Sequence, residues 1–263
     1  MTEFYKYHGA GNDFIIIDNR DKNFDTKNTE KIRLLCDRHF GIGADGLILL
    51  ESSDKADCFM NYYNSDGTLA EMCGNGIRCT ARFFLEQTKS DKKELLIDTR
   101  AGTKKVICKD DGSISINMGT PIFVSKDFPK ESKNIENILF EFVSMGNPHA
   151  VGFVKNISEI NLSQIGPKIE NNFYFPNKIN TELVEKITDN YFKVKVWERS
   201  CGATLACGSG ACAVFSILNK NKDIKEEITL EFPGGKLFLS KNHQGEMILR
   251  GPAEFVFKGE IIL

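Results

Sequence analysis

The sequence has no strong excess of either charge: 34 basic residues stand against 36 acidic residues, and the formal net charge is −2. Surfaces that bind nucleic acids or anionic membranes need concentrated basic residues, so we expect neither partner. Long hydrophobic runs are also missing, because the longest, such as Phe14–Ile17 and Leu47–Leu50, are too short to cross a membrane, and residues 1–14 lack a signal peptide's apolar core. We therefore expect a soluble, cytoplasmic protein of one or two domains.

Cysteine occurs eight times, but no pair has the C-x-x-C spacing of zinc ribbons and redox motifs. The closest trio, around residues 201–212, has no histidine nearby, so we expect no metal site. Without a secretory signal the thiols are expected to be reduced, and core packing is the default interpretation of an isolated cysteine. Cys201 has no predicted role, and the default applies to Cys36, Cys58, Cys79, Cys108 and Cys212.

Two cysteines stand apart from this default. Cys73 in MCGNGIRC and Cys207 in ACGSGACA are each followed by Gly-x-Gly and then by an apolar run of helical period, which predicts a glycine turn at the start of a helix. The free N–H groups and the positive end of the helix dipole favour an anion there, so such a thiol is expected to lose its proton below its ordinary pKa of about 8.5.

The two cysteine turns belong to an internal duplication. Cys73 and Cys207 are 134 residues apart, as are Asn64 and Glu198, which end strand-like stretches. The pairs Gly11-Asn12 and Gly146-Asn147 are 135 apart, and the later glycine turns repeat at offsets of 132 and 133. Agreement in the same order along the chain predicts one fold unit present twice. We place the two halves at residues 1–124 and 138–263, with residues 125–137 as the linker.

Each half is expected to combine alternating strands with one long helix after its cysteine turn, an α+β organisation. In the first half a second helix is predicted over Thr29–Phe40, with Asn28 as its N-cap and Gly41 as its stop. Its counterpart is poorly defined, because Asn171–Thr181 contains a proline and is interpreted as a loop.

Two related halves facing each other would bring both thiols to one cleft. Inverting a carbon stereocentre by proton transfer needs a base on one face and an acid on the other, which a thiolate and a thiol supply without a cofactor. Helix N-termini would stabilise a developing carbanion. An amino-acid substrate suits the remaining polar residues, with Arg199 for its carboxylate. Glu198 is expected to accept from an ammonium group or to set a thiol's pKa, and His149 to poise a thiol.

Six motifs together resemble diaminopimelate epimerases over nearly the whole chain: HGAGNDF (8–14), YNSDG (63–67), MCGNGIRC (72–79), SMGNPH (144–149), WER (197–199) and ACGSGACA (206–213). The resemblance implies two homologous, pseudo-twofold-related domains, each a mixed sheet wrapped around a central helix, in a homodimer. It implies a cofactor-independent epimerase that interconverts LL- and meso-2,6-diaminopimelate in lysine and peptidoglycan-precursor synthesis.

By the same resemblance, Cys73 and Cys207 are the two acid–base residues, and His149 and Glu198 modulate their pKa values. Substrate contacts, from side chains and from the turns, are implied for Asn12, Asn64, Gly74, Asn75, Asn147, Asn180, Glu198, Arg199, Gly208 and Ser209. The chain departs from the family pattern at Gly46, where some members carry glutamine, and at Ser200 and Ala203 in ERSCGAT.

Three alternatives stay open. Another two-cysteine racemase, similar to proline racemase, would use the same chemistry on a smaller substrate. A nucleotide site is suggested by GIGADG (41–46), but this segment follows a helix and precedes a strand, which is the wrong order, and by GSGACA (208–213), whose twin lacks the pattern. A thiol redox module is disfavoured by the absence of C-x-x-C.

Overall fold

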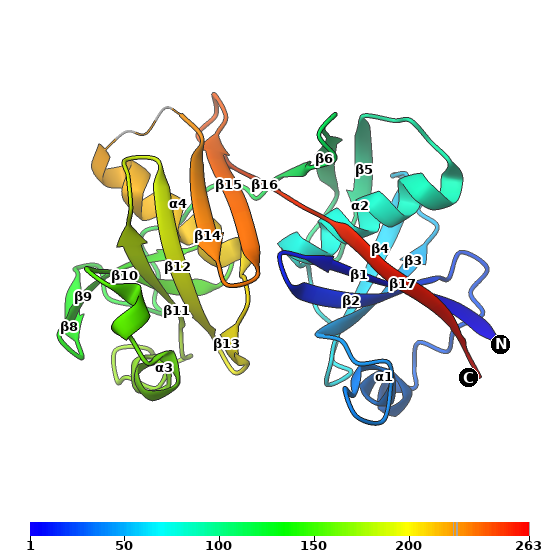
Figure 1. The fold of residues 1–263 in the computed structure, drawn as a ribbon, viewed down its shortest axis with the longest axis horizontal. Helices are drawn as coiled ribbons and strands as arrows, with labels where there is room; N and C mark the ends of the chain where they lie inside the picture. The colour runs from blue at the N-terminus through cyan, green and yellow to red at the C-terminus, as the bar shows by residue number, and fades with distance from the viewer. Residues whose placement is uncertain (223, 225, 263) are drawn as a thin grey trace. The chain divides into compact units, whose positions relative to one another are not determined.

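A computed structural model describes residues 1–222, 224 and 226–262 (Figure 1). The chain forms two compact units, Met1–Ile116 with Gly251–Leu263, and Asn117–Arg250. These packing units differ from the predicted halves, because the second unit runs from Asn117 to Arg250 and residues 251–263 join the first. The chain's last strand, β17 (Glu254–Ile261), returns to pair antiparallel with β1 (Thr2–Gly9), with Thr2 opposite Ile261. The supposed linker contributes β8 (Lys133–Ile135), which pairs with β9 (Ile138–Ser144) of the second unit.

The first unit is a mixed sheet in the order β17-β1-β2-β3-β4-β5-β6-β7. Its inner pairs alternate in direction: β1–β2 is antiparallel, β2–β3 parallel, β3–β4 antiparallel and β4–β5 parallel. The last two pairs, β5–β6 and β6–β7, are antiparallel. The bounds are β2 Asn12–Asp18, β3 Gly46–Glu51, β4 Cys58–Asn64, β5 Glu94–Asp98, β6 Lys104–Cys108 and β7 Ile114–Asn117.

The second unit repeats this series of directions. The pairs β9–β10, β11–β12, β14–β15 and β15–β16 are antiparallel, and β10–β11 and β12–β14 are parallel. A short strand, β13, pairs with the end of β12. The duplication predicted from the offsets is therefore confirmed by strand order. The bounds are β10 Pro148–Val154, β11 Asn180–Lys186, β12 Tyr191–Glu198, β13 Gly202–Thr204, β14 Ile228–Phe232, β15 Gly235–Lys241 and β16 Met247–Gly251.

One long helix lies against the sheet of each unit, as the resemblance implied. Helix α2 (Gly74–Thr88) packs on β1 to β5, and α4 (Gly208–Lys222) packs on β9, β10, β11 and β15 (Figure 1). The facing residues are fully buried, including Ile77 and Phe83 of α2 and Phe215 and Ile217 of α4. Burying side chains of this size contributes roughly 1.5–3 kcal/mol each, so each helix serves as the core of its unit.

The shorter helices show where sequence patterns fall short. Helix α1 (Thr29–Cys36) begins as predicted, with the Asn28 side chain accepting from Lys31 N at 3.0 Å. It ends earlier than Phe40, because the Asp37 carboxylate accepts from the N–H groups of residues 39 and 40 and closes a turn. Its counterpart is α3 (Leu162–Glu170), which the sequence analysis missed because Gly166 and Pro167 disfavour a helix.

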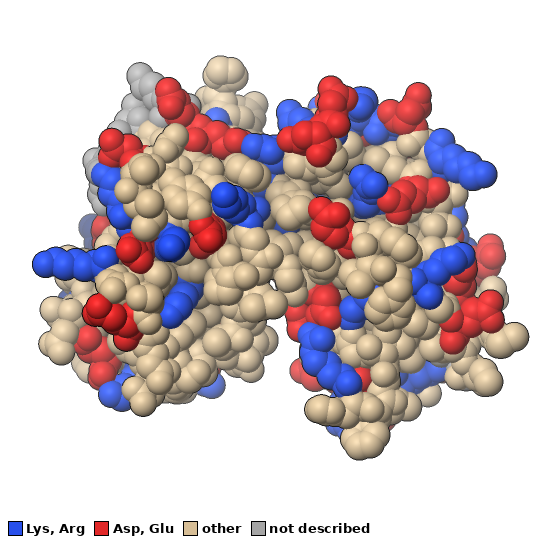
Figure 2. Space-filling view, viewed as in Figure 1, with Lys and Arg blue, Asp and Glu red and all other residues tan. Residues whose placement is uncertain are grey.

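Packing stabilises α3 despite these residues. Gly166 lies directly against the Trp197 ring, where no side chain would fit, and Glu170 accepts from the indole N–H at 2.7 Å. The loop interpretation holds for 171–179, and residues 180 and 181 already belong to β11. None of the helices in the described part of the chain has the length and apolarity that crossing a bilayer requires. Basic and acidic side chains are interspersed on the face shown in Figure 2, in keeping with the balanced composition.

Candidate active site

Both glycine turns place a cysteine sulfur at the start of a helix, as predicted. Cys73 is the N-cap of α2, in extended conformation, and its Sγ accepts from Gly76 N–H at 3.4 Å. Cys207 stands in the same relation to α4, with Sγ accepting from Gly210 N–H at 3.4 Å. The carbonyl of each cysteine accepts the first helical hydrogen bond, from Ile77 and Ala211. Each sulfur thus replaces the oxygen of an ordinary N-cap side chain.

Asn12 and Asn75, two predicted substrate contacts, lie beside Cys73. Asn12 Oδ1 accepts from Cys73 Sγ at 3.6 Å and from Asn75 Nδ2 at 3.1 Å. Asn75 Oδ1 in turn accepts from Arg78 at 2.8 Å, and this fully buried guanidinium also donates to the carbonyl of Gly74 at 2.9 Å. Side-chain hydrogen bonds therefore connect the start of α2 to the β1–β2 turn. They hold Asn12 in a defined position next to the Cys73 thiol.

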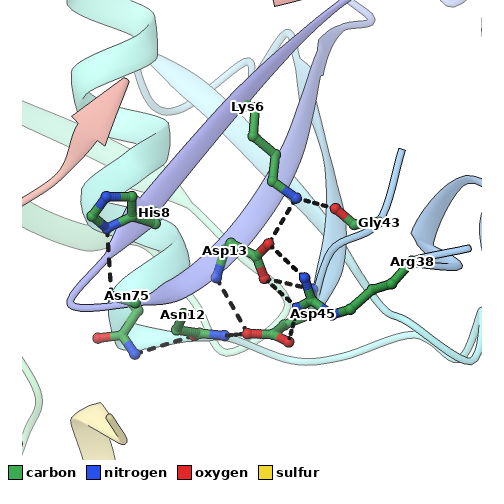
Figure 3. Close-up of polar contacts among 9 residues, drawn as sticks. Lys6, His8, Asn12, Asp13, Arg38, Gly43, Asp45 and Asn75 are labelled. Atoms are coloured by element: carbon green, nitrogen blue, oxygen red, sulfur yellow. Dashed lines mark hydrogen bonds and ion pairs between the residues drawn. The ribbon is translucent and has the colours of Figure 1, made fainter. Parts of the chain in front are cut away.

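A charged network that the sequence analysis did not identify orients Asn12 (Figure 3). Asp45 accepts from Asn12 Nδ2 at 2.7 Å, and Arg38 holds both Asp45 and Asp13 at 2.7 Å. Because an ionised carboxylate only accepts hydrogen bonds, Asn12 must direct its nitrogen at Asp45 and its oxygen at the thiol. The amide oxygen thus lies at the Cys73 sulfur, 3.6 Å from Sγ, and Asp45 holds it in that orientation.

Asp13 anchors the same network from within. Burial raises the pKa of its carboxyl group, but hydrogen bonds from Arg38 and Lys6 outweigh burial and hold the pKa at about 2. Lys6 is itself buried and lies 2.7 Å from the Asp13 carboxylate. Both partners are largely removed from water, so this salt bridge holds β1 against β2 in one geometry, and Lys6 also donates to the Gly43 carbonyl in the loop that carries Asp45.

Asn64 and Gly46 occupy the ends of β4 and β3. The Asn64 amide donates to Thr68 Oγ1 at 3.0 Å and closes a turn, and its role toward a substrate stays a prediction. A Cβ at position 46 would lie 2.5 Å from the Tyr62 ring and 2.6 Å from the Tyr63 carbonyl oxygen. The space around Gly46 is therefore filled, which explains how the chain accommodates its departure from the family's glutamine.

The Cys207 thiol is more deeply buried than predicted, and it has two carboxylates near it. Burial raises the pKa of the Cys207 thiol, and the negative charges of Glu198 and Glu182 raise it further, while contacts with Ser209 and Gly210 lower it only in part. Burial likewise raises the pKa of Glu198, whose Oε1 accepts from Thr204 at 2.6 Å. The expectation of a lowered thiol pKa at this helix start is therefore wrong for Cys207, because burial and two carboxylates outweigh the helix dipole.

A chain of polar contacts runs behind Cys207. Glu182 Oε1 lies 2.8 Å from His149 Nδ1, and His149 Nε2 lies 3.0 Å from Asn147 Oδ1. Asn147 Nδ2 donates to Ser209 Oγ at 3.4 Å, and Ser209 Oγ lies 3.4 Å from Cys207 Sγ. Three predicted site residues thus connect to the thiol, and Glu182, which was not predicted, lies at the far end.

Asn180 and Arg199 belong to the neighbouring strand ends. Asn180 is buried, donates to the Pro148 carbonyl at 2.9 Å and accepts from the Arg199 backbone N–H at 2.9 Å. The Arg199 guanidinium donates to the Asn177 carbonyl at 3.2 Å. The amide of Asn180 therefore links β10 to the turn after β12, and its predicted contact with a substrate, like that of Arg199, stays a prediction.

Four of the remaining cysteines are core residues, as predicted, and two are not fully buried. Cys36, Cys58, Cys79 and Cys212 are buried and Cys108 is half-buried, whereas Cys201 is exposed. Burial raises the pKa of the Cys36 and Cys58 thiols to about 12, which makes them inert at neutral pH. Among the described residues, no three His, Cys, Asp or Glu side chains are grouped so that they could hold a metal ion.

Three charged residues near the two cysteine sites were not predicted, because none of them belongs to a motif that was assigned to the site. Asp45 lies in the GIGADG segment, which was weighed only as a weak nucleotide pattern, and Arg38 lies in the loop after α1. Glu182 is an acidic residue within β11, and its neighbours Thr181 and Leu183 are buried as well. A carboxylate at a fully buried strand position is rare without a partner, and this rarity marks it as a candidate.

Comparison with known proteins gives consistent matches over the whole chain. The family model described as "Diaminopimelate epimerase" matches residues 4–124 and 141–256. A protein named diaminopimelate epimerase from Carboxydothermus hydrogenoformans is 44% identical, covering 99% of this chain and 100% of that one. Another, from Trichodesmium erythraeum, is 42% identical, with the same coverage of 99% and 100%.

Solved structures share the fold at low sequence identity. A phenazine biosynthesis protein of the PhzF family from Bacillus anthracis is 17% identical, with a TM-score of 0.73 and coverage of 100% of this chain and 99% of that one. A probable proline racemase from Agrobacterium radiobacter is 13% identical, with a TM-score of 0.73 and coverage of 100% and 93%. At this level of identity the likeness concerns the fold alone.

Proposed function

The chain belongs to the diaminopimelate epimerase family, and we propose that it interconverts LL- and meso-2,6-diaminopimelate by proton transfer between two cysteines. The observation that carries the proposal is the pair of N-cap cysteines, each with its sulfur on a helix N-terminus, in a chain 44% identical to a named epimerase. The product would serve lysine and peptidoglycan-precursor synthesis. A cytoplasmic homodimer is part of the same proposal.

The chemistry needs one base and one acid. A thiolate takes the proton from the substrate's α-carbon, and the electron pair left behind spreads into the adjacent carboxylate. The second thiol then gives its proton to the opposite face of the carbon, so that the two sulfurs have exchanged charge. Backbone N–H groups at a helix start stabilise the negative charge as it develops. No electron-withdrawing cofactor is required by this scheme.

We assign Cys207 as the proton donor of the resting enzyme and Cys73 as the base. Support comes from the raised pKa of Cys207, caused first by burial and then by Glu198 and Glu182. Asn147 and Ser209 connect His149 to this thiol, which supports a role for His149 in setting its protonation. Substrate contacts are proposed for Asn12, Asn64, Asn75, Asn180 and Arg199, together with the turn residues Gly74, Gly208 and Ser209.

Solvent exchange tests the reaction. In D2O, without added pyridoxal phosphate, the reduced protein should place deuterium on the α-carbon of LL-diaminopimelate while the meso isomer appears. Cys73→Ala and Cys207→Ala should each lower turnover by roughly 10²–10⁴-fold or more, because each removes an acid–base group. Circular dichroism should show that both variants fold, and Cys201→Ser serves as the matched control at an exposed thiol.

Two outcomes would contradict the proposal. No isotope exchange in fully reduced protein would exclude the reaction, and near-normal turnover in either alanine variant would exclude the two-base scheme. Exchange with proline but not with diaminopimelate would instead favour a proline racemase-like activity.

A further inference from the structure

We propose that Glu182 is a positioning residue of the Cys207 site, holding His149 through Nδ1 and placing a negative charge against the first turn of α4. The inference rests on the proposed function only in taking Cys207 as an acid–base group. Glu182 contacts His149 and lies beside Gly210.

The first support is the contact between two fully buried polar groups. His149 in β10 and Glu182 in β11 are both 0% exposed, and Nδ1 lies 2.8 Å from Oε1. A carboxylate oxygen only accepts, so Nδ1 carries the proton of this contact. The other carboxylate oxygen, Oε2, is buried and has no hydrogen-bond partner among the residues that the structure describes. Leaving such an oxygen unsatisfied costs about 1–3 kcal/mol, which is a high cost for a residue that only fills space.

The second support comes from the equivalent positions of the first unit. A Cβ built on Gly210 would meet Glu182 and Cys207, and one built on Gly76 would meet Ile48 and Cys73. Glu182 therefore corresponds to Ile48, a fully buried apolar residue. In the strand ladders, His149 pairs with Asn180 as Phe14 pairs with Gly46, so His149 corresponds to Phe14. The first unit therefore has two apolar residues, Phe14 and Ile48, at these positions, whereas the second unit has two ionisable residues. The fold itself does not require ionisable side chains there.

The third support is the electrostatic link to the thiol. The titratable groups around Cys207 are Glu198 from β12, Glu182 from β11 and His149 from β10. Glu182 is one of the two charges that disfavour the thiolate. It also lies against the first turn of α4, since its Oε1 would be 2.5 Å from a Cβ at position 210. A negative charge placed there opposes the helix dipole that would otherwise favour the thiolate.

The test compares thiol reactivity in Glu182→Gln with that in the wild type, in the full chain and without substrate. Glutamine keeps the shape and an oxygen that accepts from His149 Nδ1 but removes the charge. The pKa of Cys207 should fall, so its alkylation by iodoacetamide at pH 8, followed by peptide mass spectrometry, should become about tenfold faster. Glu185→Gln on the same strand is the matched control, because Glu185 accepts from Ile157 N–H at 3.0 Å and should leave the rate unchanged.

The proposal is overturned if Cys207 in folded Glu182→Gln is alkylated at the wild-type rate, since a merely structural role would lower stability without changing reactivity. If that variant does not fold, the double change His149→Phe with Glu182→Ile introduces the pair of the first unit and should fold with faster alkylation of Cys207. A folded double variant with an unchanged or slower rate also overturns it. The proposed function is decided separately, by isotope exchange in the wild type.

Discussion

Alanine at the third residue of each helix should have unequal effects on the two units. In Gly210→Ala the new Cβ would lie 2.5 Å from Glu182 Oε1 and 3.1 Å from its Cδ, so a buried carboxylate held by His149 must move. In Gly76→Ala the nearest atoms are Met60 Cε at 3.1 Å and Ile48 Cδ1 at 3.2 Å. Both are the ends of flexible apolar side chains, which give way by a few tenths of an ångström at little cost.

The magnitudes follow from these contacts. Displacing Glu182 loses a charge-assisted hydrogen bond, worth about 1.5–3 kcal/mol, and forcing a methyl group into filled space costs about 1–3 kcal/mol. Alanine returns up to about 1 kcal/mol through its better helix propensity. Gly210→Ala should therefore lower the free energy of unfolding by about 2–5 kcal/mol, whereas Gly76→Ala should stay within about 1 kcal/mol of the wild type.

Urea unfolding measures both changes. The only tryptophan, Trp197, lies in the second unit, so its fluorescence follows the unit that carries Gly210, and circular dichroism follows the whole chain. In a Glu182→Ala background, Gly210→Ala should cost about 2 kcal/mol less, because the clash partner is gone. Equal effects of the two glycine substitutions, or full additivity with Glu182→Ala, would refute the geometry inferred for Gly210 and Glu182.

Two further predictions concern charge and backbone strain. The Asp13 pKa of about 2 lies below its unfolded value near 3.9, so the carboxylate contributes about 2 kcal/mol that is present above about pH 4 and is lost as pH falls toward 2. Asp13→Asn should remove this contribution at pH 7 and flatten stability below pH 4 in urea titrations, and an unchanged acid limb would contradict the assignment. Ser200, where the family has glycine, adopts a left-handed φ of 65°, so Ser200→Gly should stabilise the second unit by up to about 1 kcal/mol, and a loss of stability would show that the side chain compensates.

The cysteine turns and the duplication were predictable because their signals are local. A cysteine followed by Gly-x-Gly and an apolar helical period determines a helix start from a few adjacent residues, and repetition at a near-constant offset needs no knowledge of packing. Asn28 as the cap of α1 was found for the same reason. Helix α3 was missed because its glycine and proline oppose a helix locally, whereas the packing of Gly166 against the Trp197 ring and the hydrogen bond from the indole to Glu170 form only in the folded chain.

By itself the sequence located two cysteines at helix starts and predicted Asn12, His149 and Glu198 as further residues of their sites. The tertiary structure alone decided the raised pKa values of Cys207 and Glu198 and the boundaries of the units. Burial and the charges of neighbouring carboxylates, including Glu182 from a distant part of the sequence, raise the pKa of the Cys207 thiol. Pairing of the last strand with the first assigns residues 251–263 to the first unit. Both depend on long-range contacts, which form only when distant segments pack together.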